Sequence, residues 1–259
     1  MADFASLSVT CSRAAMVQEL RRLLPSHEGL HKALPFGVGA LDSYLPVGGL
    51  ACGALHEVVP KTEGAIAAAF GFIAAILSRL PQAYPLIFVR PAYGLRQHGR
   101  LSGHGLNSLG LDPRRLILVE TAHRKETLWA LAEALRSGAP AAVAGMIDKL
   151  DLKTSQKLHL AASDCGLPLF LLRPAQTLEA SAAATRWRVG TAIAARDRFG
   201  LYARPRWHLQ LERCRNGRPG EWVVEYDHVA HRFSLAAALA DLSLSRGTGD
   251  RPLRHARRF

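Results

Sequence analysis

LHEVVPKTEGAIAAAFGFIAAILSRL, residues 55–80, contains a short apolar run, a turn and a long apolar helix in immediate succession. This is the strand–loop–helix context in which a phosphate-binding loop normally lies. A working loop presents backbone N–H groups and a Lys to phosphate oxygens, and a Ser or Thr hydroxyl to magnesium. The succession of elements therefore predicts an α/β scaffold of the nucleotide-binding kind.

The residues of this loop are not those that hold a nucleotide. Gly64 is its one glycine, and Ala65 and Ile66 follow where Lys and Ser/Thr are expected. Because aliphatic side chains supply neither charge nor metal ligation, we expect a scaffold that no longer hydrolyses nucleotide. Lys61 and the N–H groups at the start of the helix still favour an anion, which leaves weak nucleotide binding open. The complete degenerate loop is Pro60, Lys61, Thr62, Glu63, Gly64, Ala65 and Ile66.

After residue 80, apolar runs alternate with amphipathic segments. Strands are predicted at 85–89, 116–119, 141–147 and 168–172, and helices at 124–136 and 152–165. Uniformly apolar strands separated by helices indicate a parallel sheet with helices on both faces. Between about 185 and 235, apolar and polar residues alternate around a turn at 216–220, which predicts antiparallel strands and a hairpin. The predicted fold class is α/β, with a three-layer core and a mostly parallel sheet.

Composition divides the chain into three parts. Residues 1–29 form an N-terminal amphipathic helix, at 10–24, and a linker; residues 30–240 form the core; and residues 241–259 form a basic tail that we expect to be disordered. The four cysteines form no CxxC pair, which favours reduced thiols in a cytoplasmic protein over disulfides or a metal site. We also expect no signal peptide and no membrane span.

The chain is strongly basic, with 33 Lys and Arg against 21 Asp and Glu and a net charge of +12. Such a balance favours a nucleic acid or an acidic protein surface as a neighbour. Arginine and aromatic residues, which dominate protein interfaces and also bind single-stranded DNA, crowd the C-terminal third. We rank a protein interface first, because the tryptophans alternate into the predicted sheet. The candidate partner- or DNA-binding residues are Arg186, Trp187, Arg188, Arg204, Arg206, Trp207, Arg213, Arg215 and Arg218.

Two longer segments resemble RecA-type recombinases. In LPFGVGALDSYLPVGGLACGALHEVVP, residues 34–60, a Leu-Asp pair and a Gly-Gly-Leu precede the first core strand. LNSLGLDPRRLILVETAHRKETLWALAEALRSGAPAAVAGMID, residues 106–148, contains a Gly-hydrophobic-Asp turn, a strand, a helix that ends in Arg-Ser-Gly and a strand that ends in Asp. The resemblance implies a RecA-like core with Asp148 at the Walker B position. An isolated aspartate at a strand end is more often a cap or turn residue.

Within that superfamily the chain is similar to the ImuA family. The similarity lies in the lost phosphate loop combined with RWRVG at 186–190 and PRWHLQLERCRNGRPGEWVVEYDHVAHRF at 205–233. It covers about residues 30–235 as a combination of individually weak motifs. A RecA enzyme also needs a carboxylate where the strand after the helix ends, and residues 88–93, FVRPAY, supply none. The resemblance thus implies a protein without catalytic residues, metal or cofactor.

The ImuA family implies a role in SOS-induced, error-prone translesion DNA synthesis. The implied partners are ImuB, a Y-family-like polymerase homologue without polymerase activity, and RecA. An error-prone polymerase III α-type subunit is an indirect partner, and single-stranded DNA is a further candidate ligand. The implied location is cytoplasmic and nucleoid-associated, with no membrane partner.

Two other functions are compatible with the same residues. A divergent RecA-like, DNA-dependent ATPase would use Lys61 in place of the usual Lys. A cell-division inhibitor resembling SulA would also lack the phosphate loop, but the chain length and the basic C-terminal third argue against it. Loss of ATP binding in Lys61→Ala distinguishes the first alternative, and binding to the tubulin-like division protein distinguishes the second.

Overall fold

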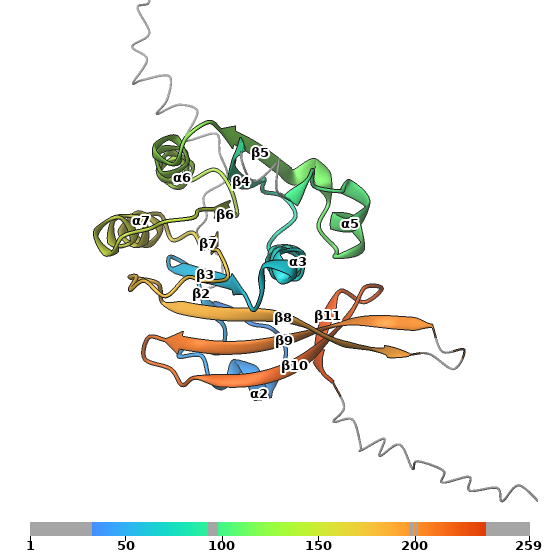
Figure 1. Ribbon diagram of the computed structural model, residues 1–259. Coiled ribbons are helices and arrows are strands. Elements are labelled where there is room, and N and C mark those ends of the chain that lie inside the picture. Colours follow the sequence, from blue (N-terminus) through green and yellow to red (C-terminus); the bar gives the residue numbers. More distant parts are fainter. Residues whose placement is uncertain (1–32, 93–97, 197–198, 200, 237–259) are drawn as a thin grey trace, which may run out of the picture.

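The computed structural model describes residues 33–92, 98–196, 199 and 201–236. Within these residues, nine strands form one sheet in the order β11-β10-β9-β8-β3-β7-β6-β4-β5 (Figure 1). A second, two-stranded sheet pairs β1 (Ala33–Leu34) with β2 (Leu50–Ala51). The short helix α2 (Gly39–Asp42) lies between these two strands in the sequence.

One half of the large sheet is parallel and the other is antiparallel. The parallel half consists of β3 (Leu55–Pro60), β4 (Leu86–Pro91), β5 (Leu116–Thr121), β6 (Ala142–Met146) and β7 (Leu169–Leu172). The antiparallel half consists of β9 (Tyr202–Cys214), β10 (Gly220–Asp227) and β11 (Arg232–Leu235). The two halves meet at β8 (Thr185–Arg196), which runs parallel to β3 and antiparallel to β9. The predicted change from a parallel to an antiparallel sheet is therefore confirmed.

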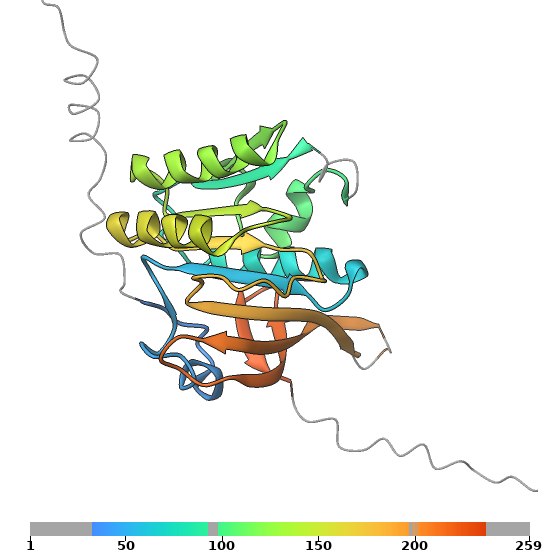
Figure 2. The same cartoon turned by 60° about the vertical axis from the view of Figure 1, so that its left-hand side comes forward.

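Helices cover both faces of the parallel half, which gives three layers (Figures 1 and 2). One face carries α3 (Ile66–Leu77), which a 3-10 turn at Glu63–Ala65 introduces. The opposite face carries α6 (Arg124–Ser137) and α7 (Leu152–Cys165). This arrangement is consistent with the RecA-like α/β fold expected from the sequence.

Two apolar clusters, one on each face, hold the layers together. Beneath α6 and α7, the side chains are aliphatic, and they include Leu131 and Leu158. On the α3 face, an aromatic cluster joins α3 to the antiparallel strands, with Phe72 lying 5.9 Å from Trp187 between ring centroids. The antiparallel half therefore shares its core with the parallel half.

Local sequence signals explain where several elements begin and end. The α7 helix has the predicted bounds, since the Asp151 carboxylate caps its first turn by accepting from Thr154 N (2.8 Å). Gly138 and Gly166 end α6 and α7 in the left-handed conformation, with φ of 62° and 69°. A helical turn expected near Leu106 is present as α5 (Gly103–Ser108).

Some expected features differ or lie elsewhere. The helix after the phosphate loop begins at Ile66, because the residues just before it, Glu63–Ala65, form a 3-10 turn. The strand β11 was not predicted, because four residues carry too little alternation to be recognised. The predicted helix at 10–24 and the basic tail at 241–259 lie outside the described residues. In the described part of the chain, every helix is too short or too polar to cross a membrane.

Candidate functional site

The degenerate phosphate loop lies between β3 and α3, at the carboxyl edge of the parallel strands. Its backbone is closed on itself, because Ala65 N donates to Thr62 O (2.9 Å) and Ile66 N donates to Glu63 O. These first N–H groups of the helix are therefore used within the turn, and they are not presented to a phosphate. Gly64 has no positive φ, and an added Cβ would approach only Thr62 Oγ1, at 4.0 Å. The backbone at Gly64 thus has room for a side chain.

The stem of the Lys61 side chain packs against β8. Lys61 N donates to Val189 O (2.7 Å), and the Lys61 stem lies 3.2 Å from the position where a Cβ on Gly190 would be. The side chain therefore packs along β8, and it lines neither of the two cavities that open beside the loop. Pro60 ends β3 and is buried.

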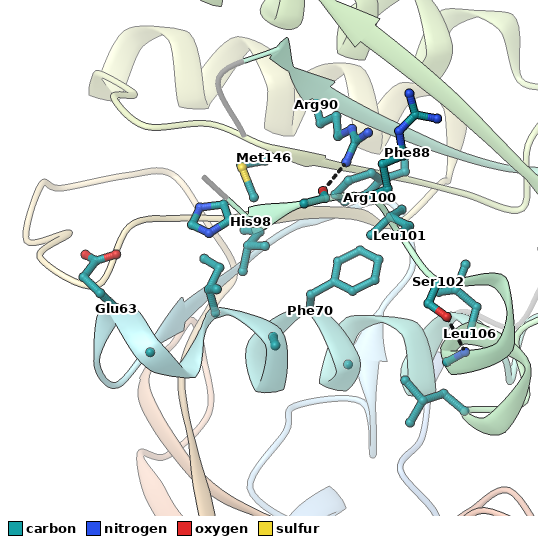
Figure 3. A pocket seen from close by; sticks show the side chains of 18 residues that line it. Glu63, Phe70, Phe88, Arg90, His98, Arg100, Leu101, Ser102, Leu106 and Met146 are labelled. Carbon is teal, nitrogen blue, oxygen red and sulfur yellow. Dashed lines mark hydrogen bonds between the residues drawn. The ribbon is translucent and has the colours of Figure 1, made fainter. Parts of the chain in front are cut away.

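The larger cavity beside the loop has a volume of about 510 Å³ and is mainly apolar (Figure 3). Ile66 and Phe70 of α3 line it together with Phe88 of β4 and Met146 of β6, and the two phenylalanine rings are in contact, with their centroids 5.1 Å apart. Where the strand after the helix ends, the buried Arg90 donates to Gly99 O (3.1 Å) and pairs with Glu120 (2.6 Å). The Arg90 charge is thus paired within the protein, and Glu63 and His98 are further polar residues that line this cavity.

Asp148, at the Walker B position, lines the smaller cavity of about 410 Å³ together with Glu63 and Arg173. Its carboxylate accepts from Lys149 N (2.7 Å), which is the geometry of a turn residue. Groups of three or more His, Cys, Asp or Glu side chains with the spacing of a metal site are absent from the described residues.

Arg186, one of the predicted partner-binding residues, belongs to a buried ionic cluster. Its guanidinium donates to the Glu57 carboxylate (2.8 Å), which also accepts from Ser181 Oγ (2.8 Å). A second arginine, Arg173, lies with Nε 3.6 Å from Glu57 and Nη2 3.5 Å from Glu179. Burial lowers the pKa of the Arg173 guanidinium, and the Glu57 charge opposes this shift. Arg186 thus stabilises the junction between β3 and β8.

Three more arginines of the predicted set are paired with carboxylates on the sheet face opposite the aromatic cluster. Arg188 pairs with Glu212, and both Arg204 and Arg206 pair with Glu225 (3.1 and 2.8 Å). Because these pairs lie on neighbouring antiparallel strands, they are cross-strand contacts of the sheet. Their positive charge is already compensated within the protein.

Trp187 and Trp207 were predicted as partner-binding residues, but the structure buries both. They are 1% and 5% exposed, respectively, and both belong to the aromatic cluster under α3. The alternation of the strands directs them inward, while the arginines beside them point to the other face. Neither indole presents a surface to a partner.

Arg213, Arg215 and Arg218 form a different group. Arg213 Nη1 donates to Ser181 O (2.6 Å) and Arg215 Nη2 donates to Ala182 O (3.2 Å), so both are held by carbonyl groups. Arg218 lies over the Tyr44 ring, 4.8 Å from its centroid. Carboxylate partners within 4.0 Å of these three side chains are absent from the described part of the chain. These arginines retain their charge for an external group.

Comparison with known proteins places this architecture in a family. The chain is 34% identical over 229 residues to Protein ImuA of Caulobacter vibrioides (strain NA1000 / CB15N), and the match covers 80% of this chain and 90% of that protein. Protein ImuA of the strain ATCC 19089 / CIP 103742 / CB 15 gives the same figures. The chain belongs to the ImuA family. No protein-family model matches it.

In this ImuA family member, two buried polar residues of β3 were not predicted as such from the sequence. His56 and Glu57 stand inside the otherwise apolar strand LHEVV, and both are wholly buried. His56 Nδ1 lies 2.8 Å from Thr185 Oγ1, and Nε2 lies 2.9 Å from Ala51 O. Two polar side chains in a central apolar strand were the available signal, since such groups need buried partners.

Proposed function

We propose that this ImuA family member is a non-catalytic accessory factor of SOS-induced, error-prone translesion DNA synthesis. The observation that carries the proposal is the 34% identity to Protein ImuA, which extends over 90% of that protein. The match also covers 80% of this chain.

The geometry of the degenerate loop supports a binding role over an enzymatic one. The N–H groups of Ala65 and Ile66 are used within the turn, and the stem of Lys61 packs along β8. The divergent ATPase would need Lys61 to face a phosphate, so this alternative gains no support. The SulA-like alternative likewise has no specific observation in its favour.

The proposed partners are those that the family implies. They are an ImuB-like polymerase homologue and RecA, with an error-prone polymerase III α-type subunit joined indirectly and single-stranded DNA as a further ligand. The proposed location is cytoplasmic and nucleoid-associated. Arg213, Arg215 and Arg218 support such a binding role, because their charges are not compensated by carboxylates.

The test is genetic and biochemical. In a strain that lacks its own copy of this gene, the full chain should restore the frequency of drug-resistant mutants after ultraviolet irradiation. The purified full chain should also retain an ImuB-like protein or RecA. DNA-stimulated ATP hydrolysis by the pure chain, or failure to restore mutagenesis, would contradict the proposal. Calorimetry with Mg-ATP measures any residual nucleotide binding separately.

A further inference from the structure

Helix α7 exposes two leucines on its outer face. Leu152 is 47% exposed and Leu160 is 60% exposed, while Leu158 and Ala162 of the same helix pack inward. Leu152, Gln156 and Leu160 follow each other at intervals of four residues, so they lie on one side of the helix. An amphipathic helix usually keeps polar side chains on its solvent side. Two exposed leucines on one side of α7, with Gln156 between them, depart from that pattern.

Leu152, Gln156 and Leu160 form part of the lining of a groove with a volume of about 340 Å³. Leu152 and Leu160 line it from α7, and Arg213 and Arg215 line it from the end of β9. The backbone segment at Ser181–Ala182 also contributes to the lining. The groove therefore combines apolar surface with two guanidinium groups contributed by a different element.

The positive charge in this groove is not balanced by carboxylates. Arg213 and Arg215 are held in place by backbone carbonyl groups, whereas Arg186 and Arg206 are neutralised by buried glutamates. A carbonyl dipole orients a guanidinium and leaves its net charge available to a carboxylate.

His159 lies in the groove as a neutral side chain. Leu55 N donates to His159 Nδ1 (3.2 Å), so the neutral ring carries its proton on Nε2. Arg215 Nη1 lies 3.3 Å from Nε2 of the same ring. Burial first, and the Arg215 charge second, lower the pKa of His159. His159 thus provides no counter-charge for Arg215.

We propose that this groove, lined by α7 and the end of β9, docks an acidic segment of a partner protein that carries two apolar anchor residues. Leu152 and Leu160 are roughly 12 Å apart along the helix, which sets the spacing of the anchors. Carboxylates of the segment contact Arg213 and Arg215. The inference deepens the proposed binding role and rests on it for the class of partner.

Charge excludes one occupant from within the chain. Residues 237–259 contain five arginines against two aspartates, so they repel a basic groove. A nucleic acid would use the arginines but would gain little from two exposed leucines, because phosphate contacts dominate its affinity. An acidic peptide with apolar anchors uses both halves of the groove.

The test is a selection of twelve-residue displayed peptides on the purified full chain. Enriched peptides should contain several Asp or Glu and two large apolar residues. In fluorescence anisotropy, the best peptide should bind at least tenfold more weakly to Arg213→Glu/Arg215→Glu and to Leu160→Ser. The matched controls are Arg114→Glu and Ile193→Ser, which change exposed residues outside the groove lining and should leave the affinity unchanged.

Several results would overturn the groove proposal. The first is enrichment of peptides that contain no acidic residues. The second is peptide binding to the groove variants with wild-type affinity. The third is a wild-type dimer that dissociates in the Arg213→Glu/Arg215→Glu variant, as measured by sedimentation. Binding of a dT20 oligonucleotide that needs the arginines and ignores Leu160→Ser would assign the groove to nucleic acid instead. Urea unfolding of each variant checks folding, and Arg215→Gln and Leu160→Ala replace any variant that unfolds.

The selection and the mutagenesis assay fail independently. If the wild-type chain does not restore mutagenesis but still selects acidic peptides that need the groove, the proposed function is wrong and the groove proposal stands. If the wild-type chain and the groove variants all restore mutagenesis and no acidic peptide is enriched, the groove proposal is wrong and the proposed function stands.

Discussion

Glu57 and Arg186, which are 129 residues apart in the sequence, form an ion pair of 2.8 Å at the junction of β3 and β8. Glu57 is wholly buried, and Arg173 approaches the same carboxylate from β7. Two guanidinium groups thus share one buried carboxylate, and Arg173 has Glu179 as a second partner. Burial makes an unpaired charge costly, so losing one partner of this cluster should destabilise the fold.

Glu57→Gln should lower the free energy of unfolding by about 3–5 kcal/mol, because it leaves the largely buried Arg186 guanidinium without a carboxylate partner and leaves Arg173 with Glu179 alone. Urea denaturation measures the loss. The matched control is Glu133→Gln, since Glu133 forms an exposed pair with Arg136 one turn away on α6. That change should cost less than about 1 kcal/mol. Equal effects of the two substitutions would show that the buried pair has no special weight.

The sequence predicts the strands, helices and their order well, because each is encoded by local periodicity and by caps such as Asp151 and Gly166. It does not predict which strands are neighbours. The pairing of β3 with both β7 and β8 depends on contacts between residues more than 100 positions apart. The Glu57 partners could not be assigned for the same reason.

In the candidate site, too, features encoded by consecutive residues were predictable, and contacts between distant residues were not. Composition alone selects nine arginine and tryptophan positions, but it does not separate a core tryptophan from an exposed arginine or a neutralised arginine from a free one. Only the fold places Arg215 beside Leu160, because α7 and β9 are distant in sequence and meet through the sheet. The degenerate loop was predictable, since its identity lies in consecutive residues.

Stability should depend on pH through His56, whose burial lowers its pKa from 6.5 to about 4. The unfolded chain binds a proton on this imidazole at a higher pH than the folded chain does, so the folded state is favoured above about pH 6.5. The free energy of unfolding should therefore decrease as the pH falls from about 6.5 to about 4, by about 3 kcal/mol in total.

Urea denaturation between pH 4 and pH 7 measures this dependence. His56→Gln, which keeps a polar side chain and cannot titrate, should be less stable at pH 7 and should show a smaller pH slope. Thr185 and Ala51, the hydrogen-bond partners of His56, are unchanged in that variant. An unchanged slope would assign the pH dependence to other groups.

Gly145 of β6 should not tolerate a side chain. An added Cβ would lie 2.8 Å from Leu131 Cδ2 and 2.9 Å from Val89 O, and the carbonyl belongs to the neighbouring strand. Gly145→Ala should therefore lower the free energy of unfolding by about 1–3 kcal/mol through overpacking between β6 and α6.

Gly64→Ala is the matched control, because the degenerate loop has room for a Cβ at that position. It should change the free energy of unfolding by less than about 1 kcal/mol, and reduced freedom of the unfolded chain makes a small gain the expected sign. Thermal unfolding of both variants measures the difference. A larger loss in Gly64→Ala than in Gly145→Ala would mean that the loop is under more constraint than its geometry indicates.

Trp187→Leu separates a core role from a partner-binding role for this tryptophan. Trp187 Nε1 donates to Thr185 Oγ1 (3.0 Å), and the ring packs against Phe36, with the ring centroids 5.4 Å apart. Losing the indole should cost about 2–4 kcal/mol of unfolding free energy through cavity formation and a lost hydrogen bond. Under conditions where the variant is still folded, the affinity for an ImuB-like protein or RecA should equal that of the wild type. Weaker binding by the folded variant would mean that Trp187 contacts a partner, which would require β8 to open on binding.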